Sequence, residues 1–225
     1  IQPNYRYSSL SASLFGTHVP EASTTTDLTW DSDDSANFQV YAIRSVPDGS
    51  STSVHRAADV RFVLTGSDNL LPMLTSSVFN NVYENKQWNL AVKVYPTKYP
   101  YTGDIEGASG SGETYTVEFY GANAELDTIE EEFSVTETIS HADAVSFLTA
   151  NKTLYAGAHK TNFTGSTLTA TDVRFGSAKV WLSRLDQDTL REHAKNPNNI
   201  GVLRPQENAF IYETEQTTVD IPMIE

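Results

Sequence analysis

The feature that most constrains this chain is a series of short segments in which apolar and polar residues alternate. In residues 88–96, one set holds Trp88, Leu90, Val92 and Val94, and the other holds Asn89, Ala91, Lys93 and Tyr95. A period of two is typical of a half-buried β-strand. The same alternation recurs at 38–46, 59–66, 113–121, 152–159 and 173–183. Gly, Pro and Asn between these segments favour turns, so the pattern predicts an all-β sandwich or barrel.

One short helix is predicted after the last strand, from Asp186 to Asn196. Asp186 is a good N-cap, and Leu185 and Leu190 have the spacing of a hydrophobic staple. The Asn196-Pro197 pair ends the helix because proline cannot continue it. Such a short helix is marginal alone, so we expect it to dock on the sheet. We also expect Trp181 to be buried between the last strand and this helix, in one core with Trp88, so that Trp181→Ala costs roughly 3–5 kcal/mol. A smaller helix, capped by Ser140, is a further option at 140–149.

Charge and composition exclude several functions. The 225 residues carry 15 Lys and Arg against 29 Asp and Glu, a net charge of −14. Nucleic acid is not an expected partner, because binding it requires a basic patch. No run of about 18 apolar residues is present, so membrane insertion is not expected either. The chain has no cysteine, which excludes disulfides and thiolate chemistry.

Three regions are predicted along the chain. Residues 1–37 are interpreted as a lead-in segment with one strand near 11–15, and residues 38–200 as the sandwich. Residues 201–225 have scattered apolar positions and are interpreted as an extended tail or a linker to a following domain. The chain is interpreted as a segment of a longer polypeptide, with a small separate protein as the alternative.

Four stretches together resemble laminin-G-like domains of the concanavalin A-like lectin/glucanase superfamily. They are the opening stretch, WNLAVKVYP at 88–96, YTVEFYGANAELD at 115–127 and LYAGA at 154–158. The resemblance covers about residues 38–195 and rests on the order of these loose motifs and on a tryptophan followed by a helix. A fainter resemblance is to such domains in large structural proteins of phages and other viruses.

The resemblance implies a two-sheet antiparallel jelly-roll sandwich whose last helix closes one edge. It also implies a non-catalytic structural or interaction module of a large multidomain protein, located at a virion surface or outside the cell. The expected partners are other domains or subunits of the same assembly, with cell-surface glycans as an alternative.

A run of carboxylates at 125–132, ELDTIEEE, raises the alternative of a glycoside hydrolase. Related glucanases of the superfamily use a Glu-x-Asp-x-x-Glu strand, which Glu125, Asp127 and Glu130 match. A retaining reaction needs two carboxyl groups about 5–5.5 Å apart. On a regular strand Glu130 faces away from Glu125, so a bulge would be required. The preceding Gly-Ala-Asn favours a turn, and Glu131 and Glu132 indicate a solvated acidic edge. We therefore predict no enzymatic activity.

A tyrosine-rich loop at 95–113 raises the alternative of a glycan-binding, lectin-like module. Tyrosines with small polar neighbours are typical of recognition loops. The loop could equally use its tyrosines to pin itself to the sandwich. The candidate ligand-binding residues are Tyr95, Tyr99, Tyr101, Asp104 and Glu106.

An oxygen-rich segment at 31–37, DSDDSAN, is a weak candidate for a calcium site. Oxygen-bearing side chains alternate along it, at Asp31, Asp33, Ser35 and Asn37. An EF-hand is excluded because Ala36 and Ala42 occupy the positions of its glycine and its bidentate glutamate. A solvated turn is the favoured interpretation, and no cofactor is expected.

Overall fold

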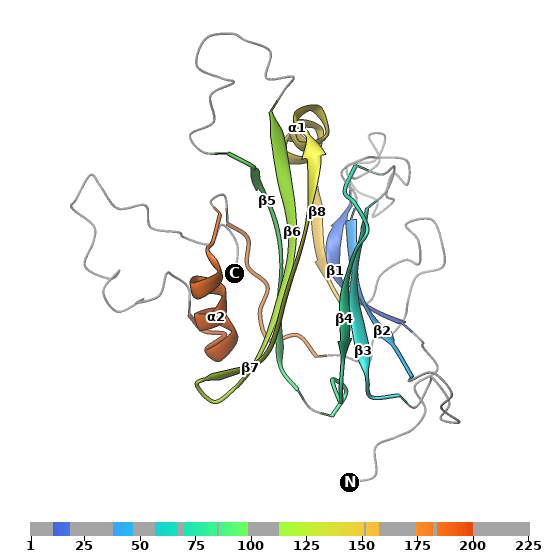
Figure 1. Cartoon of the computed structure of the whole chain (residues 1–225), viewed down its shortest axis with the longest axis vertical. Helices are drawn as coiled ribbons and strands as arrows, with labels where there is room; N and C mark the ends of the chain where they lie inside the picture. The colour runs from blue at the N-terminus through green and yellow to red at the C-terminus, as the bar shows by residue number, and fades with distance from the viewer. Residues whose placement is uncertain are drawn as a thin grey trace, which may run out of the picture.

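The computed structural model describes residues 11–18, 38–46, 57–66, 70–84, 86–98, 113–150, 152–157, 174–181 and 184–199. These residues form two antiparallel β-sheets packed face to face (Figure 1). The larger sheet has five strands in the order β4-β3-β2-β1-β8. Their bounds are Ser11–His18 for β1, Phe38–Arg44 for β2, Val60–Gly66 for β3, Leu74–Phe79 for β4 and Thr153–Ala156 for β8.

The smaller sheet is a meander of three strands in the order β5-β6-β7. The bounds are Trp88–Pro96 for β5, Thr114–Glu125 for β6 and Thr128–Ser140 for β7. β4 and β7 are outer strands of their sheets and lie against each other. The predicted β-sandwich is thus confirmed at the level of two packed antiparallel sheets.

An aromatic cluster fills the space between the sheets. The rings of Phe62 in β3 and Phe133 in β7 stack with centroids 5.8 Å apart. Trp88 in β5 lies 4.9 Å from Phe62 and 4.7 Å from Phe79, again between ring centroids. The inward set predicted from the alternation of 88–96 packs on this core, as does Phe119. The period-two pattern therefore identified the buried face of β5 and β6 correctly.

The strand expected near residues 11–15 extends from Ser11 to His18 and lies inside the larger sheet. It pairs with β2 on one side and β8 on the other. Ala12 and Leu14 belong to the main core. Part of the segment interpreted as a lead-in therefore contributes to the sandwich, while the three-region division of the chain stays a prediction.

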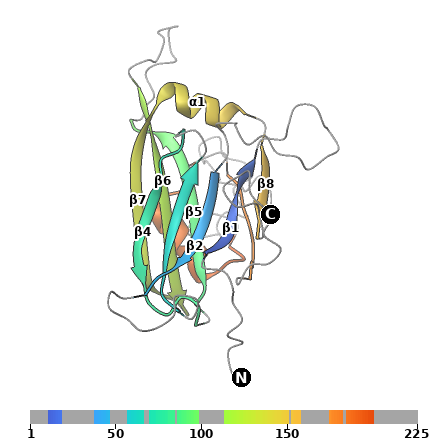
Figure 2. The ribbon, with the colours of Figure 1, turned by 90° about the vertical axis from the view of Figure 1, so that its right-hand side faces the viewer.

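A helix directly after β7, α1 (His141–Thr149), covers one end of the sandwich (Figure 2). Ser140 caps it by accepting a hydrogen bond from the backbone N–H of Asp143. Phe147 enters the main core, its ring centroid 6.0 Å from that of Phe38. The option of a helix at 140–149 is confirmed, so the described fold has two helices rather than the single helix of the main prediction.

The second helix, α2 (Gln187–Lys195), forms where the capping residues predicted it. The side chain of Asp186 accepts a hydrogen bond of 2.7 Å from the backbone N–H of Thr189, and Leu185 and Leu190 are both buried. Its position differs from the expectation, because α2 lies on the outer face of the three-stranded sheet and not at an edge (Figure 1). The inner face already packs on the larger sheet, whereas the outer face carries apolar residues that need cover.

The strand expected at 173–183 is absent from the described residues 174–181, which contain a single bridge residue, Val180. Residues 174–178 are all exposed, so their alternation does not correspond to a buried face. Lys179 donates hydrogen bonds of 2.7 Å to the backbone oxygens of Pro197 and Asn199. This segment is therefore attached to the end of α2 through a side chain.

Candidate functional site

The carboxylates that suggested a hydrolase lie around the tip of the β6–β7 hairpin. Glu125 ends β6, and Leu126 and Asp127 form the turn, with φ of 55° at Leu126. Glu130 is the extra residue of a bulge, since Asn123 pairs with Glu131 and Ala124 with Ile129. Glu125, Asp127 and Glu130 are all exposed. The turn expected at Gly-Ala-Asn (121–123) is wrong, because these residues are buried inside β6 and pair with β5. The expected exposure of Glu125 and Glu130 to solvent is confirmed.

The next two carboxylates do not form the solvated edge that was expected. Glu131 and Glu132 are partly buried, and each has a cationic partner. Lys86 lies 2.5 Å from a carboxylate oxygen of Glu131, and Arg191 lies 3.0 Å from one of Glu132. The two neighbours point to opposite sides of β7, so one contacts the segment before β5 and the other contacts α2.

A buried ion pair lies on the outer face of the smaller sheet. Lys93 in β5 and Glu118 in β6 are directly opposite in the register, and their charged atoms are 2.9 Å apart. Their side chains are only 8% and 4% exposed. Ser134 and Gln187 donate to the other oxygen of Glu118, at 2.9 and 3.5 Å. This carboxylate therefore has charged or polar partners at both oxygens.

These partners determine the protonation state of Glu118. Burial raises the pKa of its carboxyl, but Lys93, Ser134 and Tyr95 together outweigh burial and bring the pKa below its usual range. Glu118 is therefore ionised at neutral pH, and its charge is neutralised by Lys93.

Tyr95 is the one candidate ligand-binding residue that falls within the described residues. Its hydroxyl donates a 3.0 Å hydrogen bond to Glu118, and the guanidinium of Arg184 lies 4.0 Å from its ring centroid. Burial and the neighbouring Glu118 raise the pKa of Tyr95. Tyr95 thus packs where the sheet meets the start of α2. Tyr99, Tyr101, Asp104 and Glu106 lie outside the described residues.

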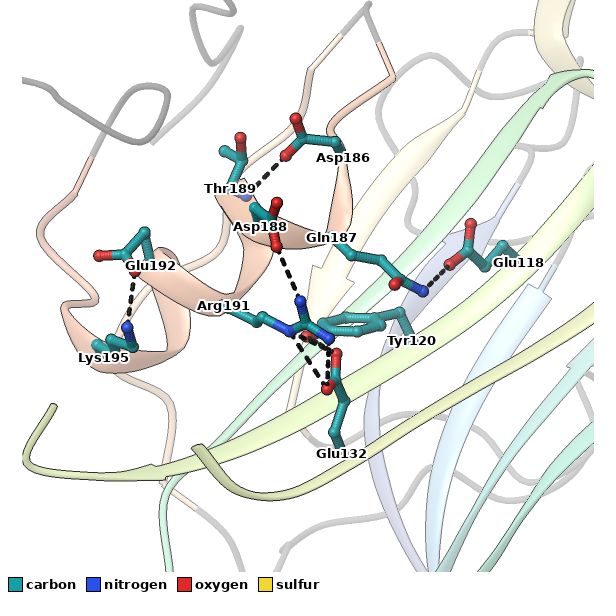
Figure 3. Close-up of polar contacts among 10 residues, drawn as sticks. All are labelled: Glu118, Tyr120, Glu132, Asp186, Gln187, Asp188, Thr189, Arg191, Glu192 and Lys195. Atoms are coloured by element: carbon teal, nitrogen blue, oxygen red, sulfur yellow. Dashed lines mark hydrogen bonds and ion pairs between the residues drawn. The ribbon is translucent and has the colours of Figure 1, made fainter. Parts of the chain in front are cut away.

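A second polar group, at Glu132, joins α2 to the sheet (Figure 3). The guanidinium of Arg191 donates to both oxygens of Glu132 at 3.0 to 3.2 Å, and the hydroxyl of Tyr120 donates to the same carboxylate at 2.8 Å. Burial raises the pKa of Glu132, but Arg191 and Tyr120 outweigh it, so the pKa is lowered. Arg191 also pairs with Asp188 on its own helix at 2.8 Å.

Apolar contacts complete the interface between α2 and the sheet. They form a small cluster apart from the main core, made of Tyr120, Ala122, Leu185, Leu190 and Ala194. Trp181 packs on this cluster and stacks on His193, with ring centroids 5.2 Å apart. The expectation that Trp181 and Trp88 share one core is wrong, because the smaller sheet separates them.

We call the groups around Glu118 and Glu132 the polar layer: Lys93, Tyr95, Glu118, Tyr120, Glu132, Ser134, Gln187 and Arg191. Sequence reasoning could have found two of its members, Lys93 and Glu118, because they are charged residues on the outward face of two neighbouring strands. Nothing in the sequence pairs Glu132 with Arg191, which are 59 residues apart. The layer positions an amphipathic helix, and each of its carboxylates contacts a cation.

The candidate calcium ligands Asp31, Asp33, Ser35 and Asn37 lie outside the described residues. Within the described part of the chain, no three His, Cys, Asp or Glu side chains gather in a way that could hold a metal ion. Among the same residues, neither helix is long and apolar enough to cross a membrane.

Comparisons with known protein families, with curated proteins and with solved structures find no match to this chain. The described residues define an antiparallel β-sandwich with a helix held on the outer face of its smaller sheet by a polar layer.

Proposed function

We propose that this chain is a non-catalytic structural or interaction module of a large multidomain surface or virion protein. Its role would be to make assembly or attachment contacts with other domains or subunits. The observation that carries the proposal is the state of Glu118 and Glu132, whose lowered pKa values and cationic partners suit the attachment of a helix. A carboxylic acid that donates a proton in catalysis instead needs a raised pKa and an open approach for substrate.

The finer fold assignment, a laminin-G-like jelly roll, belongs to the same proposal. Its support is the order of the motifs and the sandwich of two antiparallel sheets. The virion or extracellular location is supported by the resemblance alone. This kind of sandwich hosts enzymes, lectins and structural modules, so fold by itself does not select among them.

Two assays test the proposal against its alternatives. We expect no hydrolysis of laminarin or lichenan, and no specific binding on a glycan array. Turnover that disappears in Glu125→Gln would identify a glycoside hydrolase. An array signal that disappears in a Tyr99→Ala/Tyr101→Ala variant would identify a lectin-like module. Either positive result would replace the non-catalytic structural proposal.

A further inference from the structure

The sandwich core is complete without α2. The main core cluster contains residues from β1 to β4, β6, β7 and α1, and none from the described residues 174–199. The apolar residues of α2 belong to the separate small cluster on the other side of β5-β6-β7. Removing α2 would therefore uncover the outer face of the smaller sheet and leave the space between the two sheets closed.

The attachment of α2 combines a buried apolar cluster with polar contacts, of which the Arg191–Glu132 pair is partly exposed. The side chains of Arg191 and Glu132 are 38% and 26% exposed. Two further contacts reach the backbone of the helical segment, from Asn89 to the oxygen of Leu190 at 3.2 Å and from Lys93 to that of Leu185 at 3.5 Å. A partly exposed ion pair opens more readily than the contacts of a buried apolar core, because water can take the place of either charged partner.

Charge also distinguishes α2 from the rest of the chain. The segment 184–199 has three basic residues, Arg184, Arg191 and Lys195, and three acidic residues, Asp186, Asp188 and Glu192, so its formal charge is zero. The whole chain carries −14. Two copies of this acidic chain repel each other in most orientations. A helix with no net charge does not meet this repulsion when it approaches Glu132 of another copy.

We propose that α2 is an exchangeable element, and that the outer face of β5-β6-β7 binds the α2 of a second copy of this chain. A nine-residue helix is only marginally stable by itself in water. An α2 that leaves its own sheet therefore needs another sheet with the same apolar face and the same carboxylate to dock on. A second copy presents both, in the same geometry. The inference rests on the proposed role in assembly, where neighbouring copies are concentrated enough to compete with the chain's own sheet.

Charge reversal tests the exchange directly. In a sample of Glu132→Arg alone, two arginines face each other where α2 meets the sheet. In a sample of Arg191→Glu alone, two glutamates do. In a mixed dimer that exchanges α2, both interfaces regain opposite charges. Sedimentation velocity should show at least about tenfold more dimer in an equimolar mixture than in either variant alone, because two bidentate pairs are restored. The double variant Glu132→Arg/Arg191→Glu should sediment as a monomer, like the wild type at the same concentration.

A neighbouring ion pair supplies the matched control. Lys86, just before β5, pairs with Glu131 in β7 and not with α2, so a mixture of Lys86→Glu and Glu131→Arg should not dimerise. Three results would overturn the proposal: no excess dimer in the test mixture, equal dimer in the control mixture, or loss of the strand circular dichroism signal in either test variant. The hydrolysis and glycan assays do not depend on α2, so failure here is distinct from failure of the proposed function.

Discussion

Arg191 in α2 binds Glu132 in β7 through both carboxylate oxygens, with its Nε atom 3.0 Å from Oε1 and its Nη2 atom 3.0 Å from Oε2. The hydroxyl of Tyr120 in β6 donates to the same carboxylate. Three elements of the fold therefore meet at one side chain. Because a forked contact fixes direction as well as distance, it sets the position of α2 along the sheet.

Replacing this carboxylate should loosen α2 without disturbing the core. Glu132→Gln is expected to lower the free energy of unfolding by about 1 kcal/mol, since the pair is partly exposed. Amide hydrogen exchange in 184–199 should accelerate more than exchange in β6. Glu131→Gln is the matched control, because Glu131 contacts Lys86 and not the helix. An equal effect of the two variants would contradict the assigned role of Glu132.

Stability should decrease in acid because the pKa values of Glu118, Glu132 and Asp186 are all lowered in the folded chain. A lowered folded pKa stabilises the fold above the ordinary carboxyl value, and this contribution is lost as the pH falls through the folded value. Urea unfolding midpoints should therefore drop below about pH 4.

The Glu118→Gln variant checks the origin of that dependence. At neutral pH it should lose about 3 kcal/mol, because Lys93 is left buried without its carboxylate. The difference from wild type should shrink as the pH falls, since the wild-type carboxylate then becomes neutral too. A difference that stays constant down to about pH 3 would show that Glu118 does not titrate in this range.

The two tryptophans should differ in their contribution to stability. Trp88→Ala should cost about 3–5 kcal/mol, because Trp88 packs among Phe62, Phe79 and Phe133. The same cost was the sequence-based expectation for Trp181, which is only half-buried and packs on the small cluster under α2. Trp181→Ala should now cost about 1–2 kcal/mol. Equal urea midpoints for the two variants would contradict the separation of the clusters.

A close approach at Gly121 makes this position intolerant of a side chain. A Cβ atom there would lie 2.3 Å from Cε1 of Phe133 and 2.7 Å from Cδ2 of Leu90. Gly121→Ala should therefore lower the free energy of unfolding by about 1–3 kcal/mol through overpacking. At Gly176 no atom lies within 4 Å of such a Cβ, so Gly176→Ala should change thermal stability little. An unchanged free energy of unfolding in Gly121→Ala would contradict the packing of β6 against Phe133.

Calcium should not be needed for stability. We expect the melting temperatures in EDTA and in excess calcium to agree within about a degree, because a bound metal would raise the value by mass action. A loss of several degrees in EDTA that calcium restores would assign a site to Asp31, Asp33 and Asn37.

Local patterns were sufficient to predict much of this fold. The alternation of 88–96 identified the buried face of β5, and the caps at Ser140 and Asp186 located the starts of both helices. These features depend on the side-chain period of a strand and on hydrogen bonds within one turn. The same reasoning failed at 174–181, where the residues alternate but only Val180 forms a β-bridge.

The sequence by itself determined the all-β class, the alternating faces of the strands and the caps of two short helices, because these properties arise from neighbouring residues. Tertiary structure alone decided that Ser11–His18 lies inside the larger sheet, that α2 covers a face, and that Glu132 binds Arg191. Each of these depends on residues far apart in the chain, whose approach is set by the packing of whole elements and leaves no local pattern in the sequence.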